Sequence, residues 1–109
     1  MSDEISIDLF NLLDLRVGIV VEAERIPNSK KLLKLKVDVG DEIRDVVAGG
    51  GEYYDPSYFV GKRFIVLTNI KPRKIMGVES RGMLLAADVN GKPVWLTVYG
   101  EAPAGSRVR

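Results

Sequence analysis

The residues with the greatest chemical potential are the cations around Pro72. Lys71, Arg73 and Lys74 flank this proline closely, and its ring restricts the backbone that carries them. Cations held so close together repel one another, so their placement is favourable opposite phosphate oxygens, which Arg and Lys side chains bind. The segment therefore predicts a constrained, exposed turn that binds a polyanion. A solvated hairpin loop without a ligand is the alternative interpretation.

The charge of the chain is concentrated rather than evenly spread. The sequence has a formal net charge of +1, from 16 basic and 15 acidic residues. Residues 60–81 nevertheless hold 6 basic residues and 1 acidic residue, whereas residues 1–59 hold 7 basic and 12 acidic residues. A second basic cluster, with no acid inside it, runs from Arg25 to Lys36 and includes Lys30 and Lys31. This asymmetry indicates a polyanionic ligand on one face, with a solvated strand face as the alternative.

The residue types that most enzymes use are missing. The sequence contains no Cys and no His, which excludes disulfides, thiol nucleophiles, imidazole bases and almost every zinc site. No paired-carboxylate motif, Ser-based nucleophile motif or phosphate-binding lysine loop occurs. The run Gly49–Gly51 instead suits a strand end with close packing. We therefore predict no catalytic residues, no metal site and no cofactor, apart from weak binding of a hard cation at Asp41 and Glu42.

The elements that must position these residues are short strands. Apolar residues alternate over 15–24, which predicts a strand with one apolar face formed by Leu15, Val17, Ile19, Val21 and Ala23. Further strands are predicted over 32–39, 43–48, 63–69, 82–88 and 94–98, and hairpin turns at Gly40-Asp41 and Asn90-Gly91.

Little of the chain suits a helix. A short helix is predicted near the N-terminus, with Asp8 as its N-cap and an apolar stripe of Leu9, Leu12 and Leu13. Pro56 with Ser57 predicts a short helix or turn, and Pro103 and Gly105 predict an irregular C-terminus. Five core strands with so little helix favour one all-β domain over residues 1–109. Its expected form is a five-stranded oligonucleotide-binding-fold (OB-fold) barrel, with a short N-terminal helix and extra C-terminal strands.

Five motifs in this order resemble the tRNA-binding domain family. They read Asp14-Leu15-Arg16-Val17-Gly18, Ser29-Lys30-Lys31-Leu32, Val47-Ala48-Gly49-Gly50, Asn69-Ile70-Lys71-Pro72-Arg73-Lys74 and Glu79-Ser80-Arg81-Gly82-Met83. The resemblance extends over residues 7 to about 100. Any one of these motifs alone is weak, and their order makes the resemblance specific. Members of the family occur as free-standing tRNA-binding proteins, as the C-terminal domain or separate β subunit of methionyl-tRNA synthetases, and in synthetase cofactors of the endothelial-monocyte-activating-polypeptide type. The resemblance implies an OB-fold barrel, in agreement with the strand pattern.

The resemblance also implies a set of binding residues. Carried over by motif, Asn69, Lys71, Arg73 and Lys74 would contact the tRNA backbone, Ser80 and Met83 would lie at the binding surface, and Lys30 and Lys31 would flank it. Arg16 is expected to pair with an acid and to have a structural role. Aromatic residues make up only 7% of the chain, which argues against a groove that stacks single-stranded bases and favours recognition of shape and phosphate position.

The expected partners follow from the same resemblance. Free-standing members are homodimers, so residues 1–13 and 89–109 would form the flanking dimerisation segments. The implied function is structure-specific but sequence-nonspecific tRNA binding, in a free-standing protein or in a non-catalytic β subunit of a methionyl-tRNA synthetase. The family also permits an export-related chaperone that binds peptides. An exposed apolar groove large enough for a peptide, beyond whatever the dimer covers, would favour that alternative.

The expected location is the cytoplasm. No apolar run approaches the roughly 20 residues that a membrane-spanning helix needs. The acidic start Met1-Ser2-Asp3-Glu4 argues against a signal or transit peptide.

Overall fold

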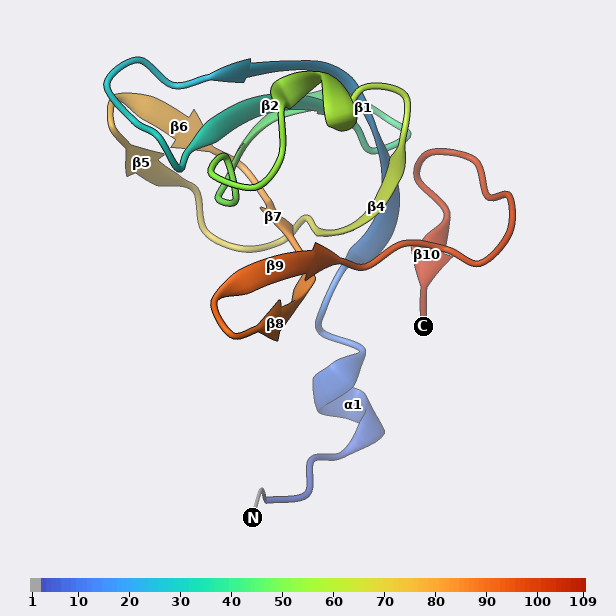
Figure 1. The fold of residues 1–109 in the computed structure, drawn as a ribbon. Helices are drawn as coiled ribbons and strands as arrows, with labels where there is room; N and C mark the ends of the chain where they lie inside the picture. The colour runs from blue at the N-terminus through green and yellow to red at the C-terminus, as the bar shows by residue number, and fades with distance from the viewer. Residues whose placement is uncertain (1–2) are drawn as a thin grey trace.

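The computed structural model describes residues 3–109 as a β-barrel with one short helix (Figure 1). An antiparallel sheet with the strand order β3-β2-β1-β4-β7 curves around the core. Its strands are β1 (Leu15–Arg25), β2 (Leu33–Asp38), β3 (Ile43–Ala48), β4 (Arg63–Leu67) and β7 (Met83–Leu84). The prediction of an all-β, five-stranded OB-fold-like barrel is confirmed.

The remaining elements lie outside this five-stranded path. They are α1 (Ile7–Phe10), the 3-10 helix η1 (Pro56–Tyr58), the hairpin β5 (Arg73–Ile75) and β6 (Val78–Ser80), the hairpin β8 (Ala86–Val89) and β9 (Lys92–Trp95), and β10 (Arg107–Val108). The predicted strand over 82–88 is divided between β7 and β8 at Leu85, whose N–H donates to the Ile65 carbonyl while its own carbonyl accepts from Leu96. The C-terminus, expected to be irregular, contributes β10, which pairs with the start of β1.

The first strand changes face along its length. Leu15 and Val17 are buried in one small cluster, whereas Val20 is fully buried in the main core. A bulge between Val20 and Glu22 shifts the register against β2, and a bulge bends a strand and increases its twist. Val21 is consequently 41% exposed, so the prediction that it shares a buried face with Leu15 and Val17 was wrong.

The barrel closes between β3 and the segment β6–β7. The Ser80 hydroxyl accepts a hydrogen bond from the Val47 N–H at 2.9 Å and donates to the Gly82 carbonyl at 3.1 Å. The Arg81 N–H donates to the Asp45 carbonyl at 2.8 Å. A side-chain hydroxyl therefore supplies part of the seam that main-chain pairing would otherwise form.

Aromatic rings fill one end of the core. Phe59 is fully buried, and its ring centroid lies 5.5 Å from that of Phe64 and 5.5 Å from that of Trp95. Tyr54 joins them at the margin and donates its hydroxyl to the Pro93 carbonyl at 2.8 Å. The Phe59–Trp95 pair is edge-to-face, and such aromatic contacts stabilise a core beyond simple burial.

The N-terminal helix α1 lies below the barrel (Figure 1). Ser6, and not the predicted Asp8, is the N-cap of α1: its hydroxyl accepts from the Leu9 N–H at 3.3 Å. Asp8 lies inside the first turn, where a carboxylate still complements the helix N-terminus. No residue of α1 is buried, and the apolar stripe predicted for the helix is exposed.

The β8–β9 hairpin turns at the predicted Asn90-Gly91 pair. Both residues have positive φ, 52° and 87°, as a tight type I′ turn requires. Within residues 3–109, no helix has the length and apolar character needed to cross a bilayer.

Candidate nucleic-acid interface

The basic segment folds into a two-stranded hairpin, and we call residues 71–80 the basic hairpin. Arg73 pairs with Ser80, Lys74 with Glu79 and Ile75 with Val78. The turn lies at Met76 and Gly77, whose φ angles are 49° and 82°, the conformation of a type I′ hairpin turn. An irregular turn around Pro72 was therefore the wrong prediction: the proline precedes β5, where its missing N–H does not interrupt the ladder.

The base of the basic hairpin is fixed to the barrel. Ser80, the last residue of β6, is 3% exposed because its hydroxyl belongs to the closing seam. Arg81 extends this attachment, since its guanidinium lies 3.4 Å from a Glu42 carboxylate oxygen. Glu42 also pairs with Arg44 at 3.1 Å, and Arg44 donates to the Thr68 carbonyl at 2.6 Å. The hairpin is thus attached on both sides, through β6 and through the end of β4.

Two lysines of the second cluster, Lys30 and Lys31, lie in the loop between β1 and β2, residues 26–32. The Ser29 hydroxyl accepts from the N–H groups of Lys31 and Leu32 at 3.3 and 3.0 Å. The Gly51 N–H donates to the Lys31 carbonyl at 2.8 Å, and a Cβ at position 51 would lie 2.9 Å from that oxygen. The glycine run therefore allows the close approach that holds this loop, as the sequence predicted.

The loop and the basic hairpin extend from the same end of the barrel. Leu33 at the start of β2 pairs with Ala48 at the end of β3. The contacts of Ser80 with Val47 and of Arg81 with Asp45 mean that β6 runs antiparallel to β3, with its hairpin turn beyond the Ala48 end. Figure 1 shows the 26–32 loop and the β5–β6 hairpin on the same side of the barrel.

Five exposed cations at this end have no partner within the described chain. Across residues 3–109, the ion pairs and side-chain hydrogen bonds engage Arg16, Lys36, Arg44, Arg81 and Arg107, together with Arg25, Lys62 and Arg63. None of them involves the cations that we call the basic surface: Lys30, Lys31, Lys71, Arg73 and Lys74. Unpaired cations gathered at one end raise the local potential that an anionic ligand meets.

Three other predicted site residues have different surroundings. Asn69 is exposed, but its Oδ1 accepts from the Asp14 N–H at 2.8 Å and its Nδ2 donates to the Leu12 carbonyl at 2.6 Å. Its amide therefore ties the chain after α1 to the end of β4. Ser80 is buried in the seam, although it was expected at the binding surface. Met83 is half-buried on β7 and, with Trp95 and Leu96, lines a mainly apolar groove of about 490 Å³.

Arg16 has the structural role expected of it. Its guanidinium lies 2.9 Å from Asp14 and 3.0 Å from Asp41, and it also donates to the Val39 carbonyl at 3.1 Å. The hydrogen bond from Arg16 lowers the pKa of Asp14, more than burial raises it. The same bond raises the pKa of Arg16. The sequence predicted that Arg16 pairs with an acid but not which one. Asp14 and Glu42 each lie two residues from an arginine partner, whereas the Arg16–Asp41 and Arg81–Glu42 contacts join residues far apart in sequence.

The described residues contain no cluster of potential metal ligands. No group of three potential ligands among His, Cys, Asp and Glu occurs within residues 3–109. Asp41, which the sequence suggested as a weak cation ligand, already pairs with Arg16.

The comparisons with known proteins agree on one family. Residues 15–107 match the family described as "Putative tRNA binding domain". The chain is 53% identical, over 97% of its own length, to a methionine–tRNA ligase of Archaeoglobus fulgidus, but it spans only 16% of that enzyme.

Two solved structures share the whole fold. A MetRS-related protein from Pyrococcus horikoshii is 41% identical with a TM-score of 0.93, and the match covers 99% of this chain and 100% of that one. The chaperone CsaA of Bacillus anthracis is 26% identical with a TM-score of 0.88, over 98% and 100% of the two chains.

Proposed function

The chain belongs to the tRNA-binding domain family, and from that premise we propose that it binds tRNA as a non-catalytic module. The observation that carries the proposal is the basic surface, five exposed cations at one end of the barrel with no partner in the described chain. Cations that contribute nothing to internal pairing are free to neutralise phosphates and release their counterions. Family membership and surface charge therefore point to the same ligand.

Recognition depends on phosphate position and shape, and not on base sequence. Phe59, Phe64 and Trp95 pack against one another in the core. The 26–32 loop and the basic hairpin, which carry the basic surface, contain no aromatic residue. The attachment of the basic hairpin through Ser80 and Arg81 fixes the spacing of its cations. A rigid array of charges without base contacts selects a folded RNA by the spacing of its backbone, as structured RNA is generally recognised.

The module acts as a homodimer through its two terminal segments, residues 89–109 and residues 1–13, of which 1 and 2 lie outside the described residues. Ile5, Ile7 and Leu12 are 66%, 69% and 68% exposed, and Leu9, Val94, Leu96 and Tyr99 are exposed as well. Exposed apolar residues gathered in this way mark an interaction surface. Two protomers would present two basic surfaces to one tRNA, which raises the affinity of a modestly charged domain.

The cellular setting that we propose is a translation complex in the cytoplasm. The similarity to methionine–tRNA ligases suggests a β subunit that raises the tRNA concentration around a catalytic methionyl-tRNA synthetase subunit. A free-standing tRNA-binding protein is the second form of the same function. Neither form requires chemistry from this chain.

The decisive experiment measures tRNA affinity against salt concentration. Lys74→Ala removes one phosphate contact, so we expect weaker binding of all tRNAs alike and a salt slope reduced by about one unit. Lys62→Ala is the matched control, because Lys62 is exposed but already donates to the Tyr58 carbonyl. If both variants lost tRNA affinity equally, the basic surface would not be the tRNA-binding site.

A peptide-binding, export-related chaperone is the second candidate function. The similarity to CsaA and the mainly apolar groove beside Met83, Trp95 and Leu96 favour it. Competition between an apolar peptide and tRNA distinguishes the two functions. Under the tRNA-binding proposal, the peptide leaves tRNA affinity unchanged.

A further inference from the structure

The second half of β1 has one edge without a strand partner. β4 pairs with β1 only from Leu15 to Ile19, and the last backbone bonds on that edge join Val20 to Gly61 and Lys62. Beyond the bulge, residues 22–25 pair with β2 alone. Within residues 3–109, no further backbone bond reaches this edge. Unpaired strand edges are templates for the addition of another strand.

The bond pattern identifies the backbone groups that face the open edge. The Ile26 N–H donates to the Leu32 carbonyl at 3.1 Å, so the backbone groups of Ile26 are directed at the β2 side. Successive residues of a strand direct their backbone groups to opposite edges. Glu22 and Glu24 therefore also bond toward β2, and the N–H and C=O groups of Ala23 and Arg25 point to the open edge.

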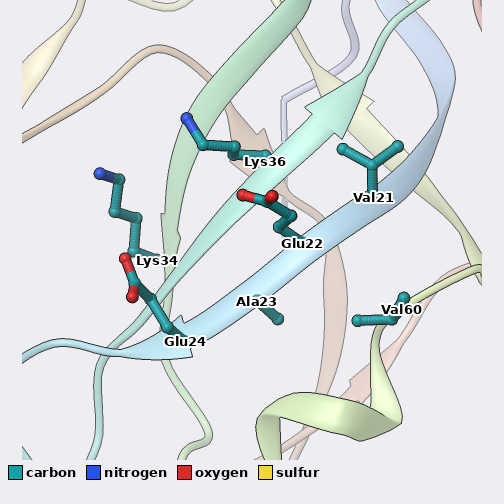
Figure 2. Close-up of a pocket in the computed structure, with 7 residues that line it drawn as sticks. All are labelled: Val21, Glu22, Ala23, Glu24, Lys34, Lys36 and Val60. Carbon is teal, nitrogen blue, oxygen red and sulfur yellow. The ribbon is translucent and has the colours of Figure 1, made fainter.

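A groove of about 390 Å³ runs along this part of β1. Figure 2 shows Ala23 and Val60 facing each other across it, while Glu22 and Glu24 project to the other side of the strand. Val21 and Val60 are 41% and 48% exposed. The open edge is thus accompanied by the apolar pair Ala23 and Val60 on one side, and by Val21 and the two carboxylates on the other.

The two carboxylates lie on β1, nearer to the open edge than Lys34 and Lys36 of β2, which line the same groove. Glu22 is the cross-strand neighbour of Lys36, and Glu24 that of Lys34. Lys36 instead pairs with Asp45 on β3 at 3.1 Å. No ion pair within residues 3–109 involves Glu22 or Glu24. A cation that approaches from the open edge would meet both carboxylates on the same face of the sheet.

We propose that the open edge of β1 at residues 22–25 binds an extended partner segment in which basic and apolar residues alternate. The segment adds as a strand whose backbone pairs with Ala23 and Arg25. Its basic side chains lie opposite Glu22 and Glu24, where opposite charges attract across strands. Its apolar side chains contact Ala23 and Val60 on the other face. The proposal concerns a protein partner and depends on neither of the functions proposed above.

The first test uses capped peptides of about ten residues, titrated into the full chain by calorimetry. A peptide of alternating Lys and Val should bind roughly tenfold more tightly than one of alternating Glu and Val, because two cross-strand charge pairs change sign. N-methylation of one set of alternate residues should abolish binding, and methylation of the other set should not, because an added strand uses only one of its edges. Strand addition would be overturned if both methylated peptides failed to bind, or if the chain bound the Lys–Val and Glu–Val peptides equally well.

The second test reverses the charge of the edge. The double variant Glu22→Lys/Glu24→Lys should no longer bind the Lys–Val peptide and should bind the Glu–Val peptide instead. The control Glu52→Lys/Glu101→Lys changes two exposed acids elsewhere by the same net charge and should keep the original preference. Saturating tRNA should leave peptide binding by the native chain unchanged. If tRNA displaces the peptide, or if neither peptide binds the native chain, this edge is not a peptide site and the proposal is wrong.

Discussion

Two groups of cations on this barrel have opposite surroundings. Arg16 and Arg44 each contact carboxylates and backbone carbonyls, and their side chains are only 22% and 15% exposed. The cations of the basic surface are exposed and contact no acid within the described chain. The first group joins distant parts of the chain, and the second joins none, which is why we propose the second group as the tRNA-binding cations. The comparison teaches that pairing, and not charge alone, separates structural cations from the other exposed cations.

The largest expected effect is a loss of tRNA affinity when the cations of the basic hairpin are removed. Replacing Lys71, Arg73 and Lys74 together by Ala should lower tRNA affinity by roughly a hundred- to a thousandfold at moderate salt, because three phosphate contacts are lost. The free energy of unfolding should change by no more than about 0.5 kcal/mol, as at other exposed sites. Filter binding and urea denaturation measure the two quantities. A large loss of stability would show that these cations are structural after all.

Replacing Arg16 should have the opposite effect, a loss of stability without a loss of tRNA affinity. Arg16→Met removes hydrogen bonds to two carboxylates and leaves the half-buried Asp14 without its main partner, which costs about 2 kcal/mol. Urea denaturation should report this loss. The affinity for tRNA and its salt slope should remain those of the native chain, and a change in the slope would mean that Arg16 also contacts phosphate.

The acid sensitivity of the fold provides a third, smaller difference. The pKa of Asp14 is lowered in the folded chain, chiefly by its hydrogen bond from Arg16. The ionised carboxylate therefore stabilises the fold above the ordinary value of 3.8, and this contribution is lost as the pH falls through the lower folded pKa. The urea midpoint should fall over this acid range in the native chain and less steeply in Arg16→Met. If the urea midpoint fell equally steeply with pH in both proteins, the Arg16 hydrogen bond would not be the cause of the lowered Asp14 pKa.

The smallest effect concerns the one acid of the basic hairpin. Glu79 lies directly across from Lys74 without forming an ion pair. Glu79→Gln removes a negative charge beside the basic surface, so tRNA affinity should rise about two- to threefold at low salt and the gain should vanish at high salt. Electrophoretic titration at two salt concentrations measures it. Weaker binding would mean that Glu79 orients Lys74.

The sequence predicted the parts of this structure whose signals are local. Alternation over 32–39 and the Asn90-Gly91 turn correspond to β2 and to the β8–β9 hairpin. The bulge in β1 was missed because its effect, the exposure of Val21, depends on pairing with β2. For the same reason, Ser80 was read as a surface hydroxyl: only the approach of Val47 from β3 explains its burial. The placement of Lys71, Arg73 and Lys74 on one hairpin followed from sequence proximity, whereas their lack of partners is visible only in three dimensions.

The Ser80 hydroxyl joins barrel closure to the position of the cations. Any fluctuation that separates β3 from β6 must break its bond with Val47 and release the base of the basic hairpin. A ligand that holds the hairpin in place therefore also opposes that fluctuation, because binding and local opening are thermodynamically linked. Binding of a ligand to the basic hairpin is therefore expected to slow the hydrogen exchange of the buried Val47 amide.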